Sequence, residues 1–167
     1  NVIYVGGGEG NIRGNVQPGA GLYVSTDAGK TWAHTLELRG AIGDIEVDPY
    51  VAETAFAAVL GNPFKSNPER GVYRTNDAGQ TWEQVLKVDA DTGASDISID
   101  ANNTRIVWAG TWQARRTPWG LTSGGPGSGL WRSADGGDTW KRLPAGEHGL
   151  PKGEWGKVGV AVSPVSG

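Results

Sequence analysis

The side chains best suited to bind a ligand gather in the segment 110–129. This segment carries Trp112, Arg115, Arg116 and Trp119 ahead of a glycine-rich run, SGGPGSG. Indole faces stack on flat or ring-shaped ligands, and the guanidinium group of arginine binds carboxylates through two parallel hydrogen bonds. We therefore expect these four residues to bind a glycan, a peptide or a protein.

A structural role is the alternative for the same segment. The tryptophans would then pack the segment onto its own sheet, and the arginines would pair with acids such as Glu147 or Glu154. Long loops usually carry function, but the residue types fit both interpretations.

Acidic side chains are the second group with chemical potential, because glycosidic bonds are hydrolysed by two carboxylates about 5–9.5 Å apart. No surrounding motif marks such a pair in this sequence, so catalytic residues stay unassigned. The candidate acids in the loops are Glu9, Glu69, Asp89, Asp91, Glu147 and Glu154.

We expect no metal site and no cofactor. Asp89, Asp91 and Asp100 fall at positions 1, 3 and 12 of a calcium-loop frame, but position 6 is Ala94, where that loop requires glycine. The chain has two histidines and no cysteine. Zinc ligation and disulfide bonds are therefore not expected.

A twelve-residue block that occurs three times defines the elements that must position these residues. The copies are GLYVSTDAGKTW at 21–32, GVYRTNDAGQTW at 71–82 and GLWRSADGGDTW at 129–140. Each copy begins with residues typical of a strand and continues with an Asp that precedes a Gly by two positions. At this spacing the carboxylate accepts backbone N–H bonds while the Gly takes a left-handed conformation. Each block therefore predicts a β-hairpin.

The residues of the block have a structural explanation, so we do not expect its aspartates to be catalytic. The Trp of each copy is expected to begin the returning strand and to fold back over its hairpin. The residues assigned to this structural role are Asp27, Gly29, Trp32, Asp77, Gly79, Trp82, Asp135, Gly137 and Trp140.

The block resembles the Asp-box, or bacterial neuraminidase repeat, S-x-D-x-G-x-T-W. The resemblance implies an all-β fold: a β-propeller segment of antiparallel four-stranded blades, with Asp-box hairpins between strands c and d. The stretches GGGEGNIRGNV, WQARRTPWGLTSGGPGSGLW and GLPKGEWGKVGVAVSP are similar to bacterial proteins with sortilin-like propellers, often labelled glycosyl hydrolases. The sialidase pattern, an Arg-Ile-Pro segment with an arginine triad and a Tyr nucleophile, is not recognisable, which counts against that activity.

Strand patterns between the blocks predict the blade borders. DIEVDP (44–49), DISIDA (96–101) and GVAVSP (159–164) alternate apolar and polar residues, which is typical of equivalent first strands. The runs VIYVGG, AFAAVLG and RIVWAG are almost continuously apolar, which is typical of second strands packed on both faces.

We accordingly expect a partial blade at 1–40, complete blades at 41–93 and 94–153, and the first strand of a further or shared blade at 154–167. A propeller usually has 4 to 8 blades. The remaining blades are therefore expected from a longer chain or from a second protomer.

The connections of such a blade alternate between its two ends. The long b–c loops, 6–21, 61–71 and 110–129, are therefore expected to gather at the end opposite the Asp-box turns. This loop end is the expected ligand-binding face.

Charge and hydropathy exclude two other classes of partner. The net charge of −3 argues against a nucleic-acid surface. The sequence contains no run of 18 apolar residues, so it predicts no membrane span. The absence of cysteine suits a cytosolic protein and a secreted bacterial protein equally, and we expect a secreted or periplasmic location.

Two functions remain open. The first is a binding or scaffolding segment that engages a protein, peptide or glycan through its loops. The alternative is part of a glycoside hydrolase of the Asp-box propeller type. The lack of a marked acid pair favours the first.

Overall fold

The computed structural model describes residues 1–165, and every regular element in this range is a β-strand. The strands are β1 (Ile3–Gly6), β2 (Gly21–Ser25), β3 (Ala33–Glu37), β4 (Ala41–Val47), β5 (Ala55–Gly61), β6 (Gly71–Thr75), β7 (Glu83–Leu86), β8 (Thr92–Ile99), β9 (Val107–Thr117), β10 (Gly120–Ser123), β11 (Gly129–Ser133) and β12 (Lys141–Arg142). The expected all-β fold without helices is confirmed for the described residues. None of them forms a helix long and apolar enough to cross a membrane.

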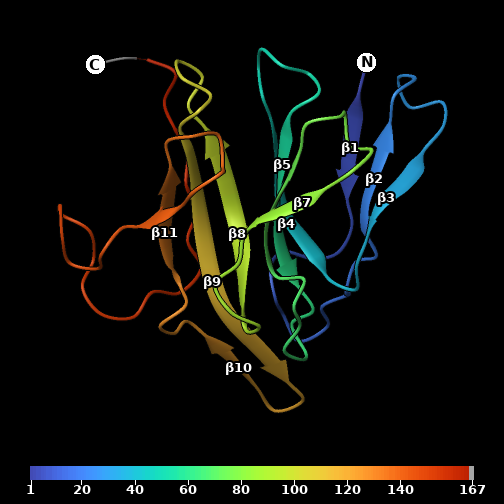
Figure 1. Ribbon diagram of the computed structural model, residues 1–167. Helices are drawn as coiled ribbons and strands as arrows, with labels where there is room; N and C mark the ends of the chain where they lie inside the picture. Colours follow the sequence, from blue (N-terminus) through green and yellow to red (C-terminus); the bar gives the residue numbers. More distant parts are fainter. Residues whose placement is uncertain (166–167) are drawn as a thin grey trace.

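The strands form three antiparallel sheets that stand side by side (Figure 1). The first sheet has the order β1-β2-β3, and the second has the order β4-β5-β6-β7. In the third sheet β8 pairs with β9, which also pairs with β10 and β11, and β11 pairs with β12. Each repeat block thus supplies the hairpin that links the last two of these paired strands in its sheet.

The three hairpin turns share one hydrogen-bond pattern. In the first turn the Thr31 amide donates to Asp27 Oδ1 over 2.9 Å, and the Thr31 hydroxyl donates to Oδ2 over 2.7 Å. The Ser25 hydroxyl donates to the same carboxylate and accepts from the Gly29 amide. Gly29 has φ of 87°, in the left-handed region that favours glycine. The same bonds recur around Asp77 and Asp135.

These hydrogen bonds predict that acid weakens the fold. They lower the pKa of Asp27 and Asp77 to about 2, and they also lower the pKa of Asp135. The largest contributions at Asp27 and Asp77 come from the hydrogen bonds of the Thr31 and Thr81 side chains. A carboxyl group with a lowered folded pKa stabilises the fold above its unfolded pKa of about 4 and loses that contribution as the pH falls toward 2. The melting temperature should therefore fall between pH 4 and pH 2, as measured by circular dichroism.

A matched variant tests this origin of the acid sensitivity. Asp77→Asn should melt at a lower temperature than the parent at pH 7 and should lose less on acidification, because one of the three titrating turns is gone. Parallel melting curves for the two proteins from pH 7 to pH 2 would contradict the assignment.

The core lies between the sheets and is built from opposite faces of neighbouring strands. Leu22 and Val24 of β2 pack against Ala57 of the second sheet. Phe56 and Val72 of the second sheet pack on the other side against a cluster from β8 and β9. The second sheet is therefore covered on both faces, and all seven residues of β5 are buried.

The apolar runs that form β1 and β9 were both expected to be packed on two faces, as β5 is, but their burial differs. Buried residues dominate β9, as expected for a strand packed on both faces. In β1, by contrast, exposed and half-buried residues alternate, and Ile3 and Val5 are exposed. Only one face of the first sheet is covered among residues 1–165, because the second sheet lies on one side of it.

The tryptophans of the repeats contact their own turns and, where one is present, a neighbouring sheet. Trp32 is 45% exposed and its ring lies beside Gly29 of its own turn, and Trp140 Nε1 donates to the Gly137 carbonyl over 3.0 Å. Trp82 is half-buried, but it packs across the joint between sheets: its ring meets Tyr4 edge-on at 6.0 Å, and its Nε1 donates to the Thr35 hydroxyl. These tryptophans therefore pack against a neighbouring sheet where one is present.

The segment 157–164 was expected to be a first strand, but the structure assigns it no strand. It runs beside β8, where the Val160 amide donates to Asp96 and the Val162 amide donates to the Ser98 hydroxyl. In the same way, the Ile97 amide of β8 donates to Asp44 of β4. The part of the predicted last strand at 166–167 lies outside the described residues.

Candidate ligand-binding site

The long connections meet at the end of the sheets opposite the hairpin turns, around the extension of β9 and β10. The expected loop at 110–129 is largely a second hairpin: β9 continues to Thr117, and β10 pairs back with it from Gly120 to Ser123. This correction has a physical reason, since the alternating segment WQARRT satisfies its backbone groups through β10. Figure 1 shows this hairpin projecting beyond the third sheet.

Arg70 ties the connections together from inside. Its exposed fraction is 0%, and its guanidinium donates to backbone carbonyls of Asn62, Asp91 and Ala114 at 2.7 to 3.3 Å. These carbonyls belong to the 62–70 connection, to the connection before β8, and to β9. Burial lowers the pKa of Arg70 to about 10, so the side chain keeps its charge at neutral pH. A buried arginine that satisfies three separate segments fixes the base of the loop end.

Arg115 is half-exposed, and its guanidinium group binds neighbouring side chains. It forms an ion pair with Asp91 and donates to the Ser66 hydroxyl, which itself donates to Asp91 over 2.7 Å. The hydrogen bond from Ser66 makes the largest contribution to lowering the pKa of Asp91, and the hydrogen bond from Arg115 makes the next largest. This triad joins β9 to two of the connections, so the structure gives Arg115 a positioning role.

Arg116 also holds backbone. It donates to the carbonyls of Thr117 and Gly120 at 2.7 and 2.6 Å, and to that of Arg13 at 3.1 Å. The turn of the projecting hairpin and the 7–20 connection are thereby fixed to one another. Neither Arg115 nor Arg116 pairs with Glu147 or Glu154. Their contacts nevertheless agree with the structural alternative, because both side chains hold the connections in place.

The two tryptophans of the segment have opposite environments. Trp112 is 5% exposed and lies in a cluster with Ile12, Val16 and Leu60. Its indole packs the connections together and does not offer a face to a ligand. Trp119 is 88% exposed at the tip of the β9–β10 hairpin, more than any other large apolar residue in the described part of the chain.

A second exposed aromatic residue lies near this hairpin. Phe64 is 47% exposed, and it follows Pro63, whose carbonyl accepts the Arg116 amide at 2.8 Å. Phe64 lies in the 61–71 connection, one of the long loops expected at this end. Phe64 and Trp119 therefore present aromatic surface at the loop end, on a base held by the arginines.

The candidate acids of this end are mostly used for structure. Asp89 accepts the Asp91 amide and the Thr92 hydroxyl, and Asp91 serves Arg115. Glu9 lies 3.7 Å from Arg13. No group of three metal-ligating side chains occurs within residues 1–165. This arrangement can bind a ligand through aromatic faces and backbone groups.

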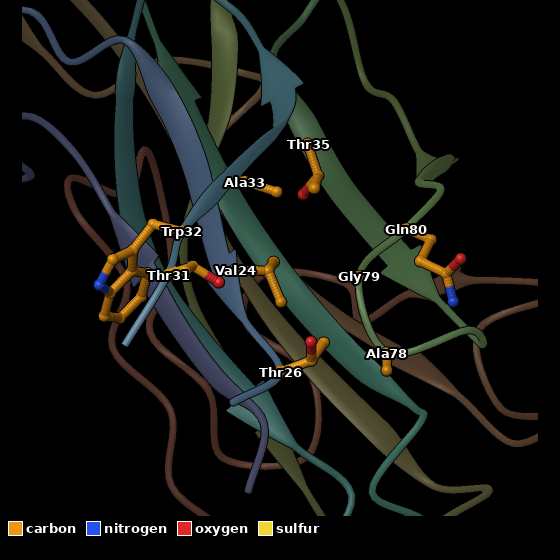
Figure 2. A pocket seen from close by; sticks show the side chains of 9 residues that line it. All are labelled: Val24, Thr26, Thr31, Trp32, Ala33, Thr35, Ala78, Gly79 and Gln80. Carbon is orange, nitrogen blue, oxygen red and sulfur yellow. The ribbon is translucent and has the colours of Figure 1, made fainter. Parts of the chain in front are cut away.

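A cavity lies elsewhere, at the joint between the first and second sheets (Figure 2). It has a volume of about 460 Å³ and is lined by β2, β3, the hairpin turn between them and the turn Ala78–Gln80, without any ionisable side chain. The equivalent cavity beside the hairpin of the second sheet has a volume of only about 210 Å³. It is smaller because Arg74 occupies the position of the repeat that Val24 occupies in the first sheet. Arg74 reaches across to Asp138 over 2.6 Å and to the carbonyl of Gly136. The cavity thus follows from a small side chain at one position of the repeat.

Comparison with known proteins decides the family. A sequence profile described as Sortilin-Vps10 (sortilin, neurotensin receptor 3) matches residues 20–157, which is most of the chain. This chain belongs to the Sortilin-Vps10 family. A search of curated proteins found no match.

Solved structures similar to this Sortilin-Vps10 chain are GH74 enzymes, which are β-propellers. An ancestral GH74 enzyme has 20% identity and a TM-score of 0.55, covering 86% of this chain and 18% of that chain. The GH74 enzyme of Niastella koreensis has 14% identity and a TM-score of 0.58, covering 90% and 20%. The GH74 xyloglucanase of Xanthomonas campestris has 17% identity and a TM-score of 0.54, covering 89% and 22%.

These similarities identify the fold. The three sheets of the Sortilin-Vps10 chain are blades of a β-propeller, as the Asp-box resemblance implied. The chain spans about a fifth of the length of the GH74 enzymes that it matches. Identities of 14 to 20% do not carry the activity of those enzymes over to this chain.

Proposed function

We propose that this chain is a propeller segment of a glycoside hydrolase of the Asp-box type, and that its loop end contributes to the saccharide-binding surface. The proposal rests on the aromatic surface of Trp119 and Phe64, which is exposed on a rigidly held end of the sheets. The likeness to GH74 enzymes supports the polysaccharide as the class of ligand, and one of them is a xyloglucanase. Secretion would follow from such a substrate and is part of the same proposal.

The geometry explains how such a surface would work. An indole ring binds a sugar ring by stacking on its apolar face, and a fixed ring loses little conformational entropy on binding. Arg116 fixes the turn that carries Trp119, and Arg70 fixes the strand and connections beneath. The arginines expected at first to contact the ligand would instead hold the aromatic residues in place.

Removing the exposed indole provides the direct test. Trp119→Ala should weaken binding to xyloglucan about two- to tenfold, since a single aromatic contact contributes about 0.5–1.5 kcal/mol. The melting temperature should not change, because the side chain is 88% exposed. Affinity electrophoresis in gels that contain xyloglucan measures the effect.

Tyr50→Ala is the matched control, because Tyr50 is 76% exposed in the β4–β5 turn at the other end of the sheets. Equal migration of the parent and Trp119→Ala in xyloglucan gels would contradict a role of this hairpin in binding. Release of reducing ends from the polysaccharide, measured in the same samples, distinguishes a hydrolase from a binding or scaffolding segment.

A further inference from the structure

The cavity between the first two sheets is formed by an internal part of the chain. Its lining comes from β2, β3 and the two hairpin turns, and all of it lies within residues 24–80. Its volume of about 460 Å³ is in the range of small-ligand pockets, about 300–1,000 Å³. In Figure 2 Val24, Thr35 and Ala78 border one space, while the Trp32 ring points away from it. The cavity is therefore a feature of the joint between two neighbouring sheets of the chain.

The repeat shows what fills this place at the next joint. Arg74 of β6 is paired in register with Glu83 of β7, and its guanidinium lies 3.2 Å from that carboxylate. The same guanidinium lies 2.6 Å from the carboxylate of Asp138 and donates to the Gly136 carbonyl over 2.7 Å. One side chain thus bridges the second and third sheets through three polar groups, and a cavity of only about 210 Å³ remains.

Neutral residues replace all three charged members of this bridge at the first joint. Val24 and its register partner Ala33 occupy the positions of the arginine and the glutamate, and Gln80 occupies the turn position of the aspartate. Val24 has no donor to offer to the Ala78 carbonyl, the counterpart of the carbonyl that binds the arginine. The space that a guanidinium group fills at the second joint is therefore open at the first, and no charge replaces it.

The lining combines polar groups with small apolar groups. The Thr35 hydroxyl accepts from Trp82 Nε1 over 3.2 Å and can still donate its own proton. The Gln80 carboxamide donates to the Asp77 carbonyl over 3.0 Å, which leaves its oxygen able to accept. A sugar residue presents hydroxyl groups at its rim and C–H groups on its faces, so it matches both kinds of lining group. A charged ligand would lose hydration here without meeting an opposite charge.

We propose that this cavity is a second saccharide site, which binds one neutral sugar residue between the first and second sheets. Hydroxyl groups of the sugar donate to the Ala78 carbonyl and to the Gln80 carboxamide oxygen, in place of the guanidinium group of the second joint. The site lies at the hairpin-turn end, opposite the loop-end surface that carries Trp119. Its ligand class follows from its own lining, so the inference goes beyond the proposed function and does not depend on it.

NMR titrations with glucose, galactose and xylose test the site directly. The backbone amide signals of Ala78–Gln80 report on the cavity, and they should shift in a saturable way. The dissociation constant should be on the order of millimolar, because the ligand is small and uncharged. Glucuronate has the same ring as glucose and an added charge, so it should bind on the order of tenfold more weakly. The Trp119 indole signal reports separately on the loop end, so failure of one site is distinguishable from failure of the other.

Copying the bridge of the second joint into the first should close the site. The triple variant Val24→Arg, Ala33→Glu and Gln80→Asp places the same three charges at the same positions of the repeat. It should fold, because the protein already contains this arrangement at the next joint. The sugar-induced shift of the Gly79 amide should disappear, and the melting temperature should not fall.

Lys30→Asp is the matched control, since Lys30 occupies the position of Gln80 in the first hairpin and does not line the cavity. This variant should respond to the sugars as the parent does. If the triple variant is less stable than the parent, Ala33→Gln replaces it, because it fills the space with a neutral side chain from an exposed position. Unmoved Ala78–Gln80 amides in the parent with all three sugars, or sugar-induced shifts that persist in a folded closed variant, would overturn the proposal.

Discussion

Replacing Arg70 with Met should lower the free energy of unfolding by about 3–5 kcal/mol. The volume of the side chain is nearly kept, so the effect would come from lost hydrogen bonds and not from a cavity. The carbonyls of Asn62, Asp91 and Ala114 would lose a charged donor in a place that water does not reach. A hydrogen bond to a charged group contributes about 1.5–3 kcal/mol, and a buried acceptor without a donor costs about 1–3 kcal/mol.

Urea unfolding of the parent and the variant measures this difference. Arg39→Met is the control, because Arg39 is exposed and its replacement should change the free energy of unfolding by less than about 0.5 kcal/mol. A similar small effect for Arg70→Met would show that the buried guanidinium does not hold the loop end. Loss of stability should be accompanied by weaker polysaccharide binding, since Trp119 projects from the strand that Arg70 anchors.

Much of the fold was predictable because the sequence repeats. Three blocks with one spacing of Asp and Gly predicted three hairpins, and the alternating runs between them predicted strands at 44–49 and 96–101. Backbone hydrogen bonding leaves few choices once turns and strands are placed, so the antiparallel sheets followed. The extension of β9 into a hairpin with β10 was not predicted, because the whole segment 110–129 was interpreted as one loop.

The environment of single residues was much less predictable. Trp112 and Trp119 lie seven positions apart in one hairpin, yet one is 5% and the other 88% exposed. No local pattern distinguishes them, because burial of Trp112 depends on Ile12 and Leu60 from other connections. Arg70 illustrates the same limit: the carbonyls that it satisfies come from three segments far apart in the sequence.

The same limit applies within the repeat itself. Trp32 and Trp82 occupy identical positions of the block, but Trp82 is covered by the first sheet while Trp32 is open. The same position of the repeat is therefore half-buried in one copy and exposed in another, depending on whether a neighbouring sheet covers it. Aromatic residues of this block are best understood as parts of a joint between neighbouring sheets.

Replacing Trp82 with Ala should therefore lower the free energy of unfolding by about 3 kcal/mol, the lower end of the range for a large aromatic residue in a core. The ring packs edge-on against Tyr4, and its Nε1 donates to the Thr35 hydroxyl over 3.2 Å. Its loss would open the joint between the first two sheets next to the existing cavity of about 460 Å³ (Figure 2). Thermal melts and urea unfolding measure the effect.

Two further variants separate packing from hydrogen bonding in this joint. Trp82→Phe keeps an aromatic ring and loses the bond to Thr35, so it should cost about 1 kcal/mol. Trp119→Ala removes an exposed indole and should leave stability unchanged. If Trp82→Ala were as stable as Trp119→Ala, the indole would not hold the sheets together, and the joint would depend on the aliphatic contacts of Leu22, Val24 and Ala57 alone. A loss of about 3 kcal/mol for Trp82→Ala with a small loss for Trp82→Phe would instead establish the repeated Trp as the residue that fastens each sheet to the one before it.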